Sequence, residues 1–261
     1  MPHGTRTGDD PSPAGQPPDP PTPDAAADSA ADSAAADAAA GRSRSAARAR
    51  LAAARPWGRH ATEAATGIGL LALSWLLLAD RTDRVPGWEA DVFSAVNGLP
   101  DVLEWPLWPV MQLGTVPMFL IGGLFVYWLT RRPRPALATG TAVLLGWVVA
   151  RVVKEAIQRG RPGALLDDVN LRTDGFFSGF GYVSGHTTVA FALATVLTAV
   201  LPGRWRFVPF PVAAVVGFAR IYFGAHLPLD VLGGAGLGIL CGLVASLAFG
   251  TIHPGRPAPD R

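Results

Sequence analysis

Residues 136–153 read ALATGTAVLLGWVVARVV, and residues 154–162 continue the chain as KEAIQRGRP. The first stretch is almost entirely apolar, whereas the second begins with Lys154 and carries two arginines. A helix needs about 20 mostly apolar residues to cross the roughly 30 Å hydrocarbon core of a bilayer. These residues therefore predict a transmembrane helix that ends in a cluster of cations.

Five further apolar runs have lengths close to that of a membrane span. They lie near residues 61–79, 107–129, 187–201, 207–223 and 229–250. Together with the run at 136–153 they predict an all-α fold, a six-span transmembrane helical bundle. We expect this membrane domain to occupy residues 60–252.

The two ends of the chain have a different composition. Residues 1–59 hold almost no large apolar side chains and are rich in Pro, Ala, Asp and Arg. Such a segment cannot bury enough apolar surface to offset the entropy lost on ordering, so we expect a disordered tail at 1–59. A second, short tail is expected at 253–261. The basic stretch at 42–59 is either a solvated arm or a segment attracted to anionic lipid.

Charge asymmetry between the loops predicts the orientation. Lys and Arg accumulate in the N-terminal tail, at 131–134, at 202–206 and in the C-terminal tail, whereas the loop at 80–104 is acidic on balance. Cytoplasmic loops carry an excess of Lys and Arg, so both termini should be cytoplasmic. The connections at 154–186 and 220–230 are then extracytoplasmic. The cations at 154–161 depart from the usual charge bias of that side, which indicates another task for them.

Composition argues against several other classes of protein. The formal net charge of +2 is too small to indicate a nucleic-acid partner. The single cysteine, Cys241, cannot form an intramolecular disulfide. The chain has no Cys/His cluster with zinc-ligand spacing, so no metal site is predicted.

The first of three polar clusters is formed by Lys154 and Arg161-Pro162. Lys154 and Arg161 are seven residues apart and share one face of a continuing helix. A phosphate group would be held there by the point charge of the lysine and the forked guanidinium of the arginine. The alternative is a pair of cations that snorkel at a helix end.

The second cluster lies in GFGYVSGHTT, residues 179–188. Small residues around Ser184 and Gly185 let backbone N–H groups approach an anion at a helix N-terminus, where the helix dipole also favours negative charge. His186 begins that helix and is expected to point into the same site. The alternative is an N-capping serine followed by an interfacial histidine.

The third cluster lies in ARIYFGAHLPLD, residues 219–230. His226 and Asp230 are four residues apart, and Arg220 precedes them. A carboxylate that accepts a hydrogen bond from one imidazole nitrogen leaves the other nitrogen available as a nucleophile. Ionisable pairs at the end of a membrane helix are functional in most cases. The predicted topology puts all three clusters at the same membrane face.

Together the clusters resemble the type-2 phosphatidic acid phosphatase superfamily, a family of lipid phosphate phosphatases. Its signature is Lys-x6-Arg-Pro, then Pro-Ser-Gly-His, then Ser-Arg-x5-His-x3-Asp, and at all but two positions this chain matches it in residue type, spacing and order. The resemblance covers about residues 61–250. Val183 replaces the motif's proline and Ala219 replaces its serine. Neither change removes a group that makes or breaks a bond, although the missing hydroxyl at 219 represents about 1 kcal/mol of hydrogen bonding.

The resemblance implies a histidine phosphatase mechanism. His226 would attack phosphorus to form a phosphohistidine, Asp230 would orient its imidazole, and His186 would protonate the leaving oxygen and then activate water. The phosphate-binding residues implied are Lys154, Arg161, Arg220, Ser184 and Gly185. No metal and no cofactor is implied, because the three cations would neutralise the phosphate oxygens as magnesium does elsewhere.

The implied substrate is a lipid phosphate in a bacterial cell membrane. A polyprenyl diphosphate such as undecaprenyl diphosphate is favoured, and phosphatidic acid and phosphatidylglycerol phosphate are the other candidates. Two alternatives are a lipid-phosphate phosphotransferase and a non-catalytic lipid-phosphate carrier. Transporters usually bind near the midplane of the membrane, whereas these clusters lie at one edge, which favours an enzyme. The sequence does not indicate the oligomeric state.

Overall fold

The computed structural model describes residues 43, 58–78, 82–172 and 179–250. Those from Gly58 onward belong to one compact unit. Every regular element in this part of the chain is helical, so the all-α prediction is confirmed. Almost all of the predicted tail at 1–59, and the tail at 253–261, lie outside the described residues.

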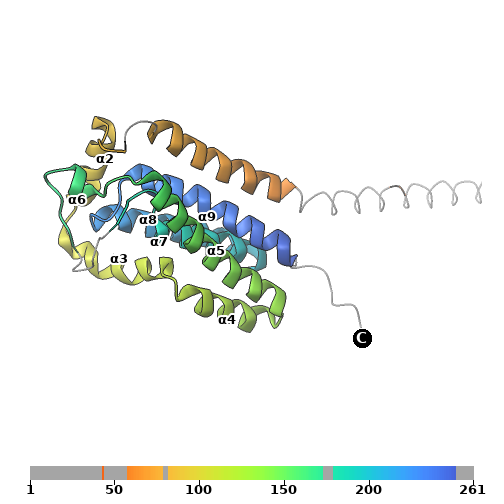
Figure 1. Ribbon diagram of the computed structural model, residues 1–261. Helices are drawn as coiled ribbons and strands as arrows, with labels where there is room; N and C mark the ends of the chain where they lie inside the picture. Colours follow the sequence, from red (N-terminus) through yellow and green to blue (C-terminus); the bar gives the residue numbers. More distant parts are fainter. Residues whose placement is uncertain (1–42, 44–57, 79–81, 173–178, 251–261) are drawn as a thin grey trace, which may run out of the picture. The chain divides into compact units, whose positions relative to one another are not determined.

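The helices follow one another along the chain, and the connection from α6 to α7 spans residues 166–184 (Figure 1). A first helix, Gly58–Leu78, is followed by α2 (Gly87–Asn97), α3 (Glu104–Met111), α4 (Met118–Thr130), α5 (Pro133–Ile157), α6 (Pro162–Leu165), α7 (Gly185–Val200), α8 (Pro209–Tyr222) and α9 (Pro228–Phe249). Three short 3-10 turns accompany them, namely η1 (Asp101–Leu103), η2 (Gln112–Gly114) and η3 (Gly203–Phe207).

Helices occupy all six positions where apolar runs predicted spans. Among the described residues, three helical segments are long and apolar enough to cross a membrane on their own. They are Gly58–Leu78, Pro133–Leu165 (which includes α5 and α6) and α9. The pair Asp101–Gly114 and Met118–Thr130 qualifies as a fourth span if its two bent halves are taken together. Because α7 and α8 are shorter, with 16 and 14 residues, the count of six spans stays a prediction.

The expected continuous helix at 107–129 is wrong, because the chain breaks between η2 and α4 and bends there by 82°. Pro117 lacks an amide hydrogen and disfavours the helical conformation at the residue before it. Thr115 is extended, and its hydroxyl donates to the carbonyl of Gln112 at 2.6 Å. A Cβ at Gly114 would lie 2.6 Å from the carbonyl oxygen of His186, so only glycine allows η2 this close to the start of α7. The segment at the break therefore packs directly against His186, one of the predicted site residues.

The core lies where α7 packs on α9, with α5 against both (Figure 1). Glycines on α9 permit this approach. A Cβ at Gly242 would lie 2.6 Å from Cβ of Thr195, and one at Gly234 would lie 2.7 Å from the carbonyl oxygen of Ser184. Small residues at such a contact let two helix backbones approach closely, which is how membrane helices associate.

The connections at one end of these helices are hydrogen-bonded to one another. The amide of Gly181 donates to the carbonyl of Arg159 at 2.7 Å, and the amide of Ser184 donates to the carbonyl of Asp230 at 2.9 Å. The amide of His226 donates to the carbonyl of Arg220 at 3.2 Å. All three predicted clusters are therefore joined at the same end of the bundle.

Candidate active site

A cavity of about 960 Å³ opens where these connections meet. Six of the eight predicted site residues line it, namely Lys154, Arg161, Gly185, His186, Arg220 and His226. The other two, Ser184 and Asp230, are fully buried behind the lining. The rest of the lining includes residues of α3, residues 114–117 at the break, and Trp147 of α5. The structure thus brings together all three clusters, which are far apart in the sequence.

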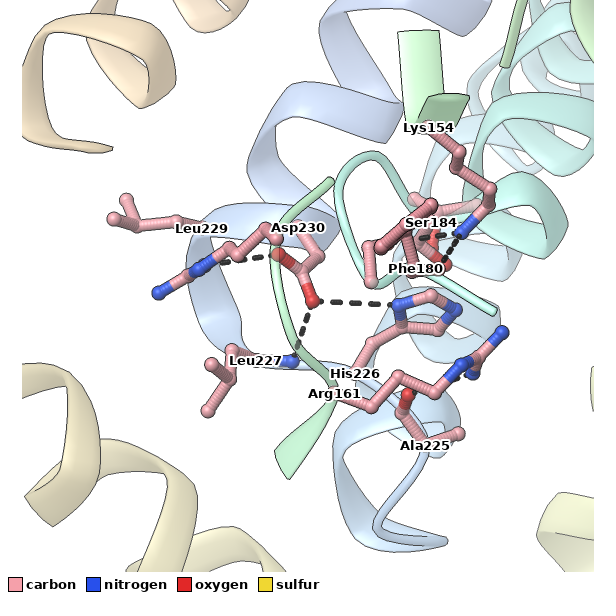
Figure 2. Close-up of polar contacts among 12 residues, drawn as sticks. Lys154, Arg161, Phe180, Ser184, Ala225, His226, Leu227, Leu229 and Asp230 are labelled. Atoms are coloured by element: carbon pink, nitrogen blue, oxygen red, sulfur yellow. Dashed lines mark hydrogen bonds and ion pairs between the residues drawn. The ribbon is translucent and has the colours of Figure 1, made fainter. Parts of the chain in front are cut away.

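His226 is held from one side by Asp230 (Figure 2). Its Nδ1 lies 3.3 Å from Oδ2 of Asp230, and the same oxygen accepts the amide of Leu227 at 3.0 Å. Asp230 occupies the third position of α9, which begins at Pro228, so the chain needs no special geometry to place it. A carboxylate on Nδ1 fixes the tautomer in which Nε2 carries the lone pair.

The other oxygen of Asp230 belongs to a buried charge network. Arg159 donates from one nitrogen to Oδ1 of Asp230 at 2.9 Å and from the other to Oε2 of Glu89 at 2.6 Å. Glu89, in α2, also accepts the amide of Leu229 at 2.9 Å. The side chains of Glu89, Arg159 and Asp230 are 0% exposed. His226 is therefore positioned by Asp230. Asp230 is held in turn by Arg159, which also pairs with Glu89.

Sequence reasoning missed Glu89 and Arg159 as members of the site. Glu89 appeared only as part of an acidic loop, and Arg159 as part of a group of cations. Glu89 is 70 residues from Arg159 along the chain, so no local spacing connects them. The one available signal was that Arg159 is a third cation within the cluster at 154–161, one more than the resemblance requires.

Ser184 and its neighbours start α7 beside the cavity. Ser184 makes no side-chain cap hydrogen bond; its hydroxyl accepts instead from the hydroxyl of Thr187 at 2.9 Å. Gly185 is the first residue of α7 and lines the cavity, and a Cβ there would meet no atom within 4 Å. The positive end of a 16-residue helix is thus open to the cavity, which favours an anion there.

The three cations predicted from the sequence donate to uncharged acceptors. Nζ of Lys154 donates to the carbonyls of Phe180 and Gly181, at 2.9 Å each (Figure 2). Arg161 donates to the carbonyls of Gly179 and Ala225, at 3.0 and 3.1 Å. Arg220 donates to the sulfur of Met111 at 3.2 Å. All three side chains line the cavity, so they contribute positive potential there.

The electrostatic surroundings keep His226 neutral. Burial lowers the pKa of its imidazole well below the usual histidine value, and the nearby charges of Lys154, Arg220 and Arg161 lower it further. Its side chain is only 3% exposed. An imidazole that stays unprotonated at neutral pH retains the lone pair needed for nucleophilic attack.

Comparison with known families identifies this part of the chain. The family model described as the PAP2 superfamily matches residues 135–253. This region belongs to the PAP2 superfamily. It contains all eight predicted site residues, whereas Glu89 precedes it.

Curated relatives of this chain come from several bacteria. It is 33% identical over 129 residues to "Bacitracin transport permease protein BcrC" of Bacillus licheniformis, over 48% of this chain and 62% of that protein. It is 24% identical over 164 residues to "Putative undecaprenyl-diphosphatase YbjG" of Escherichia coli K12, over 60% of this chain and 78% of that protein. The match thus spans less than two thirds of the length of BcrC.

Two solved structures share the fold of this chain. The crystal structure of Aquifex aeolicus LpxE matches with a TM-score of 0.54 and 28% identity, over 60% of this chain and 93% of that one. The transmembrane PAP2-type phosphatidylglycerolphosphate phosphatase of Bacillus subtilis matches with a TM-score of 0.56 and 22% identity, over 74% of this chain and all of that one. With the apolar helices described above, these likenesses make the chain a multi-pass membrane protein.

Proposed function

We propose that this protein is an integral-membrane phosphatase that hydrolyses the phosphate of a lipid phosphate or diphosphate through a phosphohistidine intermediate. One observation carries the proposal. The imidazole of His226 has one nitrogen against Asp230 and lines a cavity that also presents Lys154, Arg220 and a second histidine, His186. This arrangement supplies a nucleophile, an orienting carboxylate, an acid and an anion-binding site within one cavity.

In the first step, Nε2 of His226 attacks phosphorus. The N–P bond forms while the bond from phosphorus to the lipid oxygen breaks, and the electron pair leaves with that oxygen. His186 donates a proton to the departing oxygen. Asp230 keeps the Nδ1 proton of His226 in place and balances the positive charge that develops on the imidazole, as the buried carboxylate of a catalytic triad does.

In the second step, water replaces the histidine. His186, now neutral, accepts a proton from the water molecule as its oxygen attacks phosphorus. The N–P bond breaks, its electron pair returns to Nε2 of His226, and phosphate leaves. Lys154, Arg161 and Arg220 neutralise the equatorial oxygens in both steps, and preorganised charges of this kind usually make the largest catalytic contribution.

An amphiphilic substrate fits the composition of the cavity wall. Trp105, Trp108 and Trp147 line the cavity beside the cations, and tryptophan favours the interface between lipid and water. We favour a polyprenyl diphosphate such as undecaprenyl diphosphate. The likeness to YbjG, whose name is that of a putative undecaprenyl-diphosphatase, supports this choice, while phosphatidic acid and phosphatidylglycerol phosphate are the other candidates. The charge bias of the loops supports cytoplasmic termini and an extracytoplasmic site.

The test is phosphate release by the purified full chain in detergent with EDTA, from a panel of lipid phosphates and diphosphates. We expect release by the wild type, a loss of about 10⁴-fold or more in His226→Ala, and a loss of about 10²–10⁴-fold in His186→Ala. Labelled phosphate should appear on the wild-type protein as an acid-labile adduct and be absent from His226→Ala.

The other outcomes separate the alternatives. Unchanged release by His226→Ala would rule out this residue as the nucleophile. Binding of lipid phosphates by the wild type without release from any of them would identify a carrier. Transfer of the label to an added alcohol in preference to water would identify a phosphotransferase.

A further inference from the structure

A second, smaller recess adjoins the catalytic cavity. It has a volume of about 300 Å³ and shares Trp147, Lys154, Arg161 and Gly185 with the cavity lining. Its own lining adds Ala150, Arg151, Glu155, Gly179 and Phe180. A water molecule occupies about 30 Å³ of liquid, so the recess has room for a phosphate group and its hydration. The reaction on a phosphate monoester, as described above, makes no use of it.

Arg151 is the additional cation of this recess. It lies three residues before Lys154 on α5, so both side chains point to the same face of the helix. Its guanidinium carbon lies 5.4 Å from the ring centroid of Trp147, which lines both spaces. This distance is within the range of a cation–π contact, which restrains the arginine without neutralising it.

Among the described residues, no carboxylate forms an ion pair with Arg151. Glu155 lies four residues further along α5 and lines the same recess, yet no ion pair within 4.0 Å joins it to Arg151 in the described part of the chain. An arginine near the end of a membrane helix is costly to keep unless it reaches water, lipid headgroups or a ligand. Snorkelling would explain its charge, but it would not explain the recess shared with Lys154 and Arg161.

In a lipid diphosphate, the second phosphate is one bridging oxygen away from the phosphorus that is attacked. If the terminal phosphate lies against His226 and the three cations of the cavity, the second must lie in a space that borders the same cations. The recess meets this condition, because Lys154 and Arg161 belong to both linings. Cations that face two spaces can bind oxygens of both phosphates.

We propose that Arg151 and Trp147, together with the shared Lys154 and Arg161, form a subsite for the second phosphate of a lipid diphosphate. This subsite rests on the proposed phosphatase function and gives the enzyme its preference for diphosphates over monoesters. In the step it serves, the N–P bond to His226 forms and the bond between phosphorus and the bridging oxygen breaks. The electron pair stays on that oxygen, and the leaving group is a lipid monophosphate whose new charge is stabilised by Arg151.

The experiment compares phosphate release from farnesyl diphosphate and farnesyl monophosphate in the same detergent micelles. We expect Arg151→Gln to lower kcat/KM for the diphosphate about 10- to 100-fold, the usual size for loss of a hydrogen bond to a charged group. The monophosphate value should change less than about twofold, and Arg151→Lys should retain part of the preference, because it keeps the charge but not the fork.

Two matched variants serve as controls. Arg134→Gln removes the same charge at the other end of α5, and Glu155→Gln removes the carboxylate of the recess. Neither should lower the ratio of the two kcat/KM values. A measurement on the wild type adds an independent check, since inorganic diphosphate should inhibit release from the monophosphate more strongly than orthophosphate does.

The outcomes distinguish the subsite from the phosphatase function. Equal losses on both substrates in Arg151→Gln, or no loss on either, would overturn the subsite and leave the phosphatase in place. Equal inhibition by orthophosphate and diphosphate would overturn it without any variant. If the wild type releases phosphate from neither lipid, the proposed function fails and the subsite fails with it.

Discussion

Arg159 and Arg161 are two residues apart in the sequence, yet they lie in opposite kinds of surroundings. Arg159 is fully buried between the carboxylates of Glu89 and Asp230. Arg161 lines the cavity, and the acceptors described for it are the carbonyls of Gly179 and Ala225. One arginine therefore balances negative charge behind His226, whereas the other offers positive charge in front of it.

The residue type alone therefore does not determine the role of either arginine. A buried arginine between two carboxylates is required by the fold, because removing it leaves two buried negative charges side by side. Arg161 instead lines the cavity, so we expect its main contribution to be phosphate binding. The same substitution at the two positions should therefore affect different properties.

The largest expected effect is on stability, in Arg159→Met. Loss of the arginine should lower the free energy of unfolding by about 3–5 kcal/mol, the usual result of breaking a buried ion pair from one side. Thermal unfolding of the full chain in detergent measures it, and Arg161→Met is the matched control, with a shift expected to be several times smaller. Equal shifts in the two variants would contradict the distinction between the two arginines.

For the catalytic activity of the folded protein, we expect Arg161→Met to have the larger effect of the two variants. Arg161→Met should lower kcat/KM for phosphate release about 10²–10³-fold, since removal of one preorganised charge from a transition state has an effect of this size. The protein should elute from size-exclusion chromatography as the wild type does. A loss of less than about threefold would mean that Arg161 does not contact the phosphate.

The sequence predicted the residues that line the cavity better than the buried pair Glu89 and Arg159 that supports them. The front residues follow helix periodicity and short spacings, so Lys154 and Arg161, or His226 and Asp230, could be paired from the sequence alone. Glu89 comes from a separate helix, α2, and meets Arg159 only through the tertiary fold. The break near Pro117 was missed for a similar reason, because the apolar run continues through it and its purpose, contact with α7, depends on the fold.

A smaller effect is expected on the pH profile. Burial and the front cations lower the pKa of His226, so its imidazole stays neutral as the pH falls through the usual histidine value of about 6.5. The acid limb of kcat/KM that reports His226 should therefore lie well below the usual histidine value. In Arg161→Met one of the cations that lower this pKa is gone, so the pKa should rise and the limb should move to higher pH.

This prediction is measured as the difference between the two profiles on one substrate, because ionisation of the substrate is common to both and cancels. If the carboxylate of Asp230 outweighed burial and the cations, the wild-type His226 pKa would instead lie at or above its usual value. The acid limb would then lie near about pH 6.5 or higher. An unchanged limb in Arg161→Met would show that the front cation does not influence the nucleophile.

The smallest effect is expected at Ala219, where the sequence departs from the family pattern. Ala219 is fully buried in α8, packed with the side chains of Leu107, Met111, Tyr222 and Phe223 rather than in the cavity lining. In Ala219→Ser the new hydroxyl would be buried there, and its cost of about 1–3 kcal/mol is largely offset if it donates to the carbonyl one helical turn earlier. We expect kcat/KM to change less than about threefold and the free energy of unfolding to change by about 1 kcal/mol or less. Since the phosphate-binding groups stay in place, a rise in kcat/KM of about tenfold or more would mean that the hydroxyl reaches the phosphate, and that this side of α8 belongs to the front of the site rather than to its support.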